Sequence, residues 1–286
     1  MSLLNSVNTN VGAMIALESL NSTNTALAAA QKQVSTGYRV ADSTDDGAAY
    51  AIAQSVRSTV GALASANQQL GTVQGLLSTT QSSMNNISNT MSSMRDVLVK
   101  LSDSSVTSSD RTNYIAQYNS LLANVKTFIE DANYNGKTLI GNITGGSGTF
   151  SRVAVVRNES GASYAIATFS GSALFGSISY TSTQLLAATT VQGIIGTAAG
   201  ASFINKFNAV NNELNTIGSA QNYVTNQVSY NSNKIDALNT GLGALVDADL
   251  AQESAKLQAL QIRQQLGTQA LSLANQAPQT LLSLFK

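Results

Sequence analysis

The stretch that decides the fold is FINKFNAVNNELNTIGSAQNYVTNQVSYNSNKIDALNTGLGAL, residues 203–245. Thirteen of its positions follow one another at steps of 4 and 3 residues without a break, and eleven of the thirteen are apolar. They are Phe203, Phe207, Val210, Leu214, Ile217, Gln221, Val224, Val228, Asn231, Ile235, Leu238, Leu242 and Leu245. A straight α-helix drifts away from a 3.5-residue repeat, so this spacing predicts a long helix whose seam follows another helix in a coiled-coil-like bundle.

A single amphipathic helix of a globular core is the simpler alternative, but such helices rarely keep strict phase past about 20 residues. Two of the seam positions are polar, Gln221 and Asn231. Polar groups on a seam cost stability but can fix the register of the two helices. We therefore expect these two side chains to align a helix pair.

Composition narrows the class of protein. Lysine plus arginine number 15 and aspartate plus glutamate also number 15, so no net charge draws the chain to nucleic acid or to an acidic membrane. Cysteine and histidine are both absent, which removes disulfides, thiolate chemistry and most imidazole-based general acid–base and zinc sites. We expect no enzymatic activity, no cofactor and no metal.

Neither a membrane segment nor a cleaved signal peptide is expected. No apolar run approaches the length of a membrane span. The first six residues have neither a basic region nor a continuous apolar region. A protein of this kind leaves the cell, if it does, by a route that needs no signal peptide.

The N-terminal segment Leu3–Ser35 repeats the spacing of the opening stretch, in Ala13, Leu17, Leu20, Asn24, Leu27, Gln31 and Val34. Only four of these seven side chains are large and apolar. Burying four such side chains does not offset the conformational entropy of ordering the whole segment. We expect the segment to be disordered by itself and to need a partner surface.

An acidic loop separates this segment from the next. Gly37 is expected to end the first helix in a left-handed conformation. Capping groups for the following helix are expected from Asp42, Ser43, Thr44, Asp45 and Asp46. A calcium loop starting at Asp42 would need a bidentate glutamate at its twelfth position, which is Ala53. The loop fails that test.

A second long helix is predicted over Ala48–Leu101, with three methionines (Met84, Met91 and Met94) as soft packing on its seam. A polar break then precedes a shorter helix, for which Asp110 is the expected N-cap. On the C-terminal side, Gly241 and Gly243 are expected to break the long helix, and a last helix begins near Leu250.

The middle of the chain changes composition, since ten of the 21 glycines lie between Gly141 and Gly200. Asn135-Gly136 predicts a type I′ turn. Short strands are predicted over Val153–Val156, Tyr164–Phe169 and Leu174–Tyr180. The glycines at 145, 146 and 148 indicate a flexible turn rather than a phosphate loop, because no Lys-Ser/Thr follows them.

The two arms mirror each other around this insertion: helix and long helix before it, long helix and helix after it. The predicted fold is therefore mainly α. It is a long antiparallel helical rod of coiled-coil-like bundles, formed by the N- and C-terminal arms, with a small β-rich middle insertion.

Both ends of the chain resemble bacterial flagellin, the subunit of the flagellar filament. Residues 35–53, STGYRVADSTDDGAAYAIA, resemble the segment that joins the family's innermost N-terminal helix to its rod. Residues 245–286 resemble the C-terminal helix, including Ala274-Asn275-Gln276-Ala277-Pro278-Gln279 and the tail Leu281-Leu282-Ser283-Leu284-Phe285. The resemblance covers roughly residues 1–141 and 200–286, and the short insertion is similar to that of small alphaproteobacterial flagellins.

The resemblance implies three domains. Residues 1–40 and 246–286 would form an inner two-helix filament-core domain, and residues 41–141 and 191–245 a helical rod domain. Residues 142–190 would form a small β-rich outer surface domain. The self-assembly residues implied on the inner helices are Leu17, Leu20, Leu27, Val34, Leu257, Leu260, Leu271, Leu281, Leu284 and Phe285.

The resemblance also implies a secreted, extracellular protein that is exported unfolded through the flagellum's own type III channel and polymerises with itself for swimming motility. Implied partners are the export apparatus, a secretion chaperone, and the hook-junction and cap proteins at the filament ends. The family's Toll-like receptor surface matches Met91–Leu101, where Arg95 falls on a central arginine. Ser92 and Ser93 replace larger polar and basic residues there, so we expect weak recognition.

Two other classes of protein share features of this sequence. Another flagellar axial component, a junction or cap protein, would share the terminal helices. A chemoreceptor-like signalling coiled coil also has heptads rich in alanine, serine and glutamine, but it needs a membrane span and a helical hairpin tip. An enzyme in the insertion would need paired carboxylates, and Glu159 stands alone there.

Overall fold

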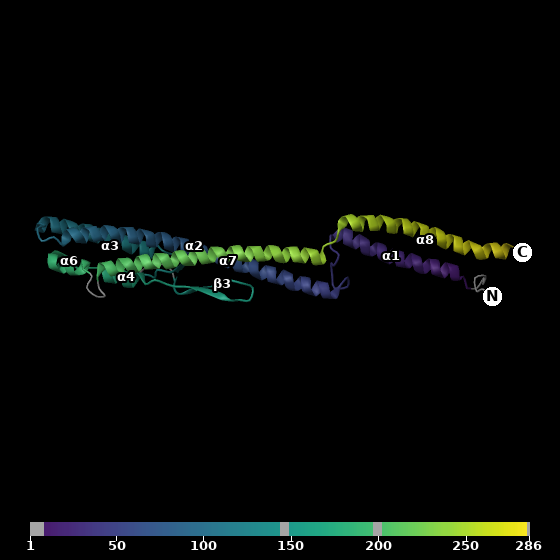
Figure 1. Ribbon diagram of the computed structural model, residues 1–286, viewed down its shortest axis with the longest axis horizontal. Coiled ribbons are helices and arrows are strands. Elements are labelled where there is room, and N and C mark those ends of the chain that lie inside the picture. Colours follow the sequence, from purple (N-terminus) through teal and green to yellow (C-terminus); the bar gives the residue numbers. More distant parts are fainter. Residues whose placement is uncertain (1–8, 144–148, 197–201, 285–286) are drawn as a thin grey trace. The chain divides into compact units, whose positions relative to one another are not determined.

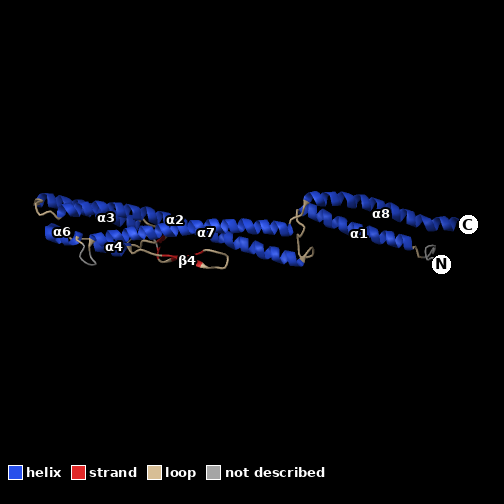
Figure 2. Cartoon of the chain, viewed as in Figure 1, coloured by secondary structure: helices blue, strands red, loops and turns tan. Residues whose placement is uncertain are grey.

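The computed structural model describes residues 9–143, 149–196 and 202–284. The elements in chain order are α1 (Val11–Thr36), α2 (Gly47–Leu101), α3 (Ser108–Glu130), β1 (Lys137–Thr138), β2 (Thr149–Phe150), β3 (Val153–Val156), β4 (Ser163–Ile166), α4 (Gly171–Ile178), α5 (Ser182–Leu186), α6 (Ala188–Ile195), α7 (Phe203–Val246) and α8 (Leu250–Leu284). Helices dominate and the strands are short (Figure 2). The predicted mainly α fold is confirmed.

The chain forms two compact units. Unit 1 contains the residues up to Thr59 and those from Asp236 onward, and unit 2 contains Val60–Ile235. Helices α1 and α8 belong to unit 1, whereas α3 to α6 and the strands belong to unit 2. The long helices α2 and α7 supply residues to both units.

In unit 2, α2 and α7 run antiparallel and are joined by polar pairs at regular intervals. Ser88 Oγ donates to Asn211 Oδ1 at 2.8 Å, and Gln74 Nε2 donates to Thr225 Oγ1 at 3.1 Å. The apolar seam of α2 runs along the same helix, and Met84, Met91 and Met94 on it are fully buried, as predicted. The seam of α7, residues 203–245, packs against the seam of α2 through Phe203, Val210, Ile217 and Val224. The 3.5-residue spacing therefore indicates a real helix–helix seam.

Helix α7 continues through Gly241 and Gly243 to Val246, so the predicted break there is wrong. Glycine costs a helix only about 1 kcal/mol relative to alanine. The seam residues Leu242 and Leu245 pack against a small cluster around Val246. This packing outweighs the low helix propensity of the two glycines.

Helix α3 begins one turn earlier than expected. Its N-cap is Thr107, whose Oγ1 accepts from the Asp110 backbone N–H at 3.2 Å, so the N-cap predicted at Asp110 is wrong. In the same turn, Arg111 is buried and donates to the backbone oxygens of Leu101 at 2.6 Å and Asp103 at 2.7 Å. The guanidinium thus satisfies carbonyls at the C-terminal end of α2, where a cation is favoured by the helix dipole.

The middle of the chain is part strand and part helix. Strands β3 and β4 form an antiparallel hairpin in which Val153 pairs with Ile166 and Val156 with Ser163. The short β1 and β2 pair in parallel. The two strands predicted at these positions in the hairpin are confirmed, with β4 ending at Ile166 rather than Phe169.

The third predicted strand, Leu174–Tyr180, is wrong, because that segment lies in helix α4 and the turn after it. Its alternating apolar residues suggested a strand, but the Ser170 side chain caps a helix instead, accepting from Ala173 N at 3.3 Å. Leu174 and Ile178, four residues apart, are then buried on one face. The Asn135-Gly136 turn is confirmed, with φ of 51° and 76° and mutual backbone hydrogen bonds between Tyr134 and Lys137.

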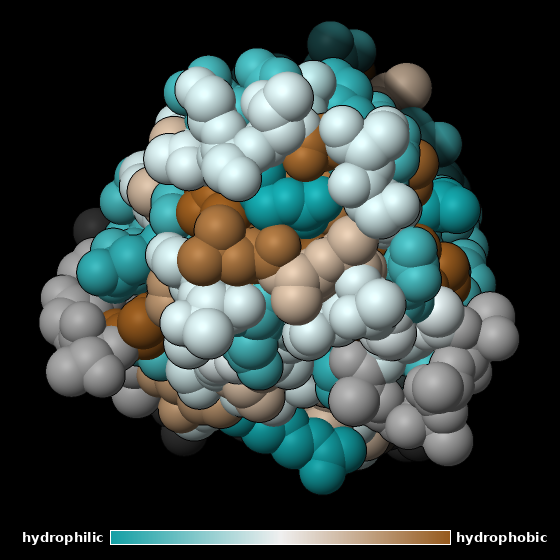
Figure 3. Space-filling view, turned by 90° about the vertical axis from the view of Figure 1, so that its left-hand side faces the viewer, coloured by the Kyte–Doolittle hydropathy of each residue, from teal (hydrophilic) through white to brown (hydrophobic). Residues whose placement is uncertain are grey.

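The end of unit 2 where α2 gives way to α3 is shown in Figure 3. An apolar band lies there among polar side chains. The glycines at 145, 146 and 148 lie outside the described residues, as do Leu3 and Phe285.

Candidate assembly surface

Helices α1 and α8 lie side by side and antiparallel in unit 1 (Figure 1). Asn10 Nδ2 donates to the backbone oxygen of Ala274 at 2.7 Å, and Gln264 Nε2 donates to Asn24 Oδ1 at 2.8 Å. A Cβ placed on Gly267 would lie 3.2 Å from Cδ1 of Leu20. These contacts give the pair one register from end to end.

The core shared by α1 and α8 is small. Among the side chains of the pair that the structure describes, its buried members are Leu27, Ala30 and Leu260, with Ala26 and Leu257 packed against them. Two leucines and an alanine bury far less apolar surface than two helices of this length need in order to stay folded by themselves. The pair is therefore weakly stabilised by its own contacts.

The residues predicted for self-assembly are placed differently along this pair. Leu27 and Leu260 are buried, Leu20, Val34, Leu257 and Leu271 are half-buried, and Leu17 is 49% exposed. Leu281 and Leu284 lie in the last turns of α8, and Phe285 lies outside the described residues. Leu20, Leu27, Leu257 and Leu260 thus meet between the helices, while Leu17 faces solvent.

A second apolar stripe faces solvent and was missed by reading only the seam. Its members are Met14 (63% exposed), Ile15 (62%), Ile262 (58%), Leu266 (59%) and Leu273 (70%). On α8 their spacing of 4 and 7 residues is itself heptad-like, and it places them on the face opposite the seam. That spacing is the sequence signal that could have found them.

Shallow grooves run along the N-terminal half of α1. One is lined by Val11, Met14, Ile15, Leu17, Glu18 and Asn21, and another by residues of α1 together with Leu271 and Asn275 of α8. Both are mostly apolar and open to solvent. A surface of this kind marks a protein interaction site rather than a small-molecule pocket.

The segments that connect α1 to α2 and α7 to α8 are hydrogen-bonded to each other. Gly37 ends α1 with φ of 74°, as predicted, and its backbone oxygen accepts from Ala248 N at 3.0 Å. Arg39 N donates to Val246 O at 2.8 Å. Beneath them Val40 and Val246 are buried in a small apolar cluster.

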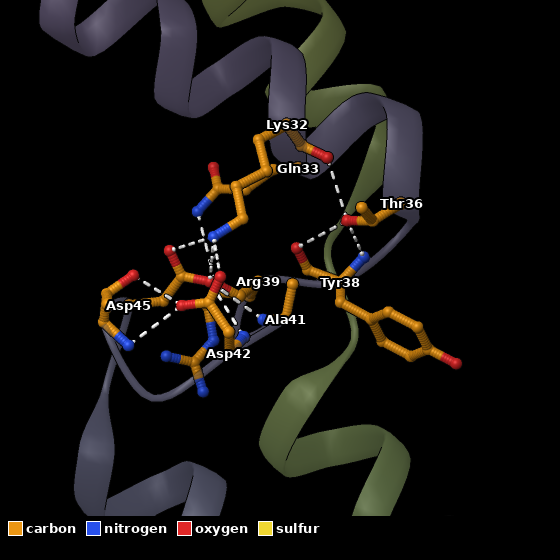
Figure 4. A network of polar contacts seen from close by, with 9 residues as sticks. Lys32, Gln33, Thr36, Tyr38, Arg39, Ala41, Asp42 and Asp45 are labelled. Atoms are coloured by element: carbon orange, nitrogen blue, oxygen red, sulfur yellow. Dashed lines mark hydrogen bonds and ion pairs between the residues drawn. The ribbon is translucent and has the colours of Figure 1, made fainter.

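The acidic loop carries its own counter-ion. Lys32 Nζ lies 2.7 Å from Asp42 Oδ2 and 2.8 Å from Asp45 Oδ1, between the two carboxylates (Figure 4). Hydrogen bonds from Lys32 and then from Thr44 hold the pKa of the Asp42 carboxyl well below its usual range. The same ion pair lowers the pKa of Asp45 and raises that of Lys32. The loop is thereby fixed to the end of α1.

Arg95, the residue matched to the receptor surface, lies on α2 in unit 2. It is exposed and lies in the sequence between the buried residues Met94 and Val97. Ser92 and Ser93 are exposed beside it.

Comparison with known proteins identifies the family. Residues 7–144 match the bacterial flagellin N-terminal helical region, and residues 204–285 match the bacterial flagellin C-terminal helical region. The chain belongs to the bacterial flagellin family. Flagellin FljK of Caulobacter vibrioides is 34% identical over 99% of both chains, and a flagellin of Brucella melitensis is 32% identical over 98% of this chain and 99% of its own.

The fold of this flagellin is also similar to a solved structure. A chain described as a flagellar hook-associated protein of Vibrio parahaemolyticus superposes with a TM-score of 0.58 at 14% identity, over 71% of this chain and 100% of its own. At that identity the similarity concerns the fold alone. Across residues 9–143, 149–196 and 202–284, none of the helices combines the length and hydropathy of a membrane span.

Family membership settles the class of function. This flagellin is a structural subunit of the extracellular flagellar filament, and it polymerises with copies of itself. The resemblance to short alphaproteobacterial flagellins, stated above from the sequence, agrees with the full-length similarity of this chain to the Caulobacter and Brucella proteins.

Proposed function

We propose that this flagellin assembles by burying the exposed apolar stripe of α1 and α8 among neighbouring copies. The observation that supports this is the imbalance within the pair. More large apolar side chains are exposed on it than are buried between its helices. Each would gain about 1.5–3 kcal/mol on burial in a neighbour.

The other parts of the proposal rest on the flagellin family. Residues 1–40 and 246–286 form the filament-core domain, residues 41–141 and 191–245 the rod, and residues 142–190 the outer surface. The chain is exported unfolded through the type III channel with a secretion chaperone, meets hook-junction and cap proteins at the filament ends, and serves swimming. Weak intrinsic stability of the α1–α8 pair suits export, because a chain that folds late is threaded more easily.

We infer further that the chain has no catalytic activity. A sequence without histidine or cysteine lacks the usual groups for proton transfer and nucleophilic attack near neutral pH.

Polymerisation of the purified full-length monomer tests the assembly proposal. Ammonium sulfate or short filament seeds are added, and filaments are counted by electron microscopy. Removing about 35 residues from either end should abolish filaments while circular dichroism still reports the helices of unit 2. Filaments formed as readily by either truncated chain would overturn the proposal.

The alternative role weighed from the sequence is a junction or cap component, which would share the terminal helices. The same polymerisation assay separates the two roles. A filament subunit elongates seeds without limit, whereas a junction component adds to seed ends and stops.

We also propose that Toll-like receptor recognition through Arg95 is weak, because its neighbours Ser92 and Ser93 offer little contact area. A receptor-reporter assay at equal monomer dose checks this. A response equal to that of a strongly stimulatory flagellin would contradict it.

A further inference from the structure

Helix α7 carries a stripe of polar and aromatic side chains that the apolar seam does not explain. It consists of Tyr223, Gln227, Asn231 and Lys234, at steps of 4, 4 and 3 residues. That spacing places all four on one face of the helix. All four contact the tip of the β3–β4 hairpin, residues 156–164, within unit 2.

The centre of this contact is one backbone carbonyl. The oxygen of Arg157 accepts from Gln227 Nε2 at 3.2 Å and from Asn231 Nδ2 at 3.0 Å. Gln227 Nε2 also donates to Asn231 Oδ1 at 3.0 Å, so the two amides support each other. A carbonyl held by two side chains of another element fixes the tip at that point.

Two further contacts flank the carbonyl. Lys234 forms an ion pair with Glu159 on the turn of the hairpin. The ring of Tyr164 stacks on that of Tyr223 with centroids 4.0 Å apart. The base of the hairpin belongs to the apolar core of unit 2, through residues such as Val153, whereas the tip is held by polar groups and one aromatic pair.

Asn231 joins the tip to a second helix. Its side chain is fully buried, and Nδ2 also donates to Oδ1 of Asn67 on α2 at 2.9 Å. One buried amide therefore connects the hairpin tip, α7 and α2. If it lost either partner, a polar group would be left unpaired in the interior, which is costly.

The hydrogen bonds of this junction are satisfied in one register of the two helices. A slip of α7 by one heptad would place an apolar residue, Val224 or Leu238, opposite Asn67. The same slip would move the amides of Gln227 and Asn231 away from the carbonyl of Arg157. We propose that the hairpin tip is a latch whose closure on Asn231 holds α7 in a single register against α2.

The test uses the full-length monomer in dilute, non-assembling solution and two readouts. Amide hydrogen exchange reports closure of the tip, for example at Arg157, whose N–H donates to Ala162 O. Nitroxide labels on Q74C and T225C report the register, because the natural chain has no cysteine and these positions face each other. A slip of one heptad would move the two labels apart by about 10 Å.

Asn231→Ala should accelerate exchange of the tip amides by about tenfold or more and add a second distance between the labels. Amides in the middle of α2 should remain protected. The matched control is Asn226→Ala, which removes an exposed asparagine of the same helix and should change neither readout. Unchanged tip exchange in the Asn231 variant would overturn the latch, and a single unchanged distance would overturn its link to the register.

A second variant keeps the inference testable if Asn231→Ala does not fold. Gln227→Ala removes one donor to the tip and leaves the Asn67–Asn231 pair in place. It should speed tip exchange and retain a single label distance. A tip that exchanges at the natural rate in this variant would contradict the latch.

Discussion

At the scale of single residues, two glycines of α4 give a sharp contrast. A Cβ on Gly171 would lie 2.6 Å from Cγ2 of Ile129 and 2.8 Å from the backbone oxygen of Ile140, whereas a Cβ on Gly176 would meet open space. Gly171→Ala should lower the free energy of unfolding by about 1–3 kcal/mol, because backbone cannot yield cheaply. Gly176→Ala should raise it by up to about 1 kcal/mol. Urea unfolding followed by circular dichroism measures both, and equal effects of the two substitutions would contradict the close packing at Gly171.

Single residues were predictable from the sequence where they lie on a seam. The buried methionines and the cross-helix amide of Asn231 follow from heptad position alone. The hydrogen bond from Asn231 to the carbonyl of Arg157 on the hairpin could not be predicted from the sequence. Polar residues off the seam, such as Gln227, have the pattern of a solvent-exposed helix face. Likewise both Thr107 and Asp110 suit an N-cap, and only the backbone geometry decides between them.

At the scale of elements, the acidic loop after α1 should respond to acid in a defined direction. Lys32 lowers the pKa of Asp42 and Asp45. Their contribution to stability is therefore complete above the unfolded value near 3.9 and is lost as the pH falls through the lower folded-state pKa. Lys32→Met should raise the pKa of Asp42 toward its usual value, measured by NMR titration of its carboxyl.

The matched control for this element is Lys256→Met, which breaks the ion pair with Glu253 on α8 and should leave the titration of Asp42 unchanged. An unshifted Asp42 in the Lys32 variant would mean that Thr44 alone supports the carboxylate.

The extents of elements followed from the sequence where the spacing was long. Both bounds of α2 and the start of α7 were predicted within one residue, because an unbroken seam leaves no other alignment. The end of α7 was predicted too early, at Gly241 and Gly243. The secondary structure of short segments was harder to predict, because apolar residues at 174 and 178 fit both a strand and a helix. This segment forms helix α4, in which Leu174 and Ile178 pack into the core of unit 2.

At the scale of the whole molecule, the sequence predicted that the terminal arms pair, because both carry the same spacing around one insertion. It did not predict which apolar residues stay exposed after pairing. Leu17 lies on the seam by spacing but is half exposed, since the contacts nearest that end are polar, such as Asn10 with Ala274. The apolar side chains that a terminal helix exposes therefore depend on how its partner helix packs against it as well as on its own heptad spacing.

The exposed stripe of unit 1 gives the prediction that bears most directly on assembly. Leu266→Ser removes an apolar side chain that is 59% exposed on α8, so the monomer should unfold at nearly the natural urea concentration. If neighbouring copies bury Leu266, about 1.5–3 kcal/mol of contact energy is lost, and the critical concentration for polymerisation should rise about tenfold or more. Tyr230→Ser is the matched control, because Tyr230 is 61% exposed but lies in unit 2. A critical concentration that rises for Tyr230→Ser and not for Leu266→Ser would place the assembly surface away from α1 and α8.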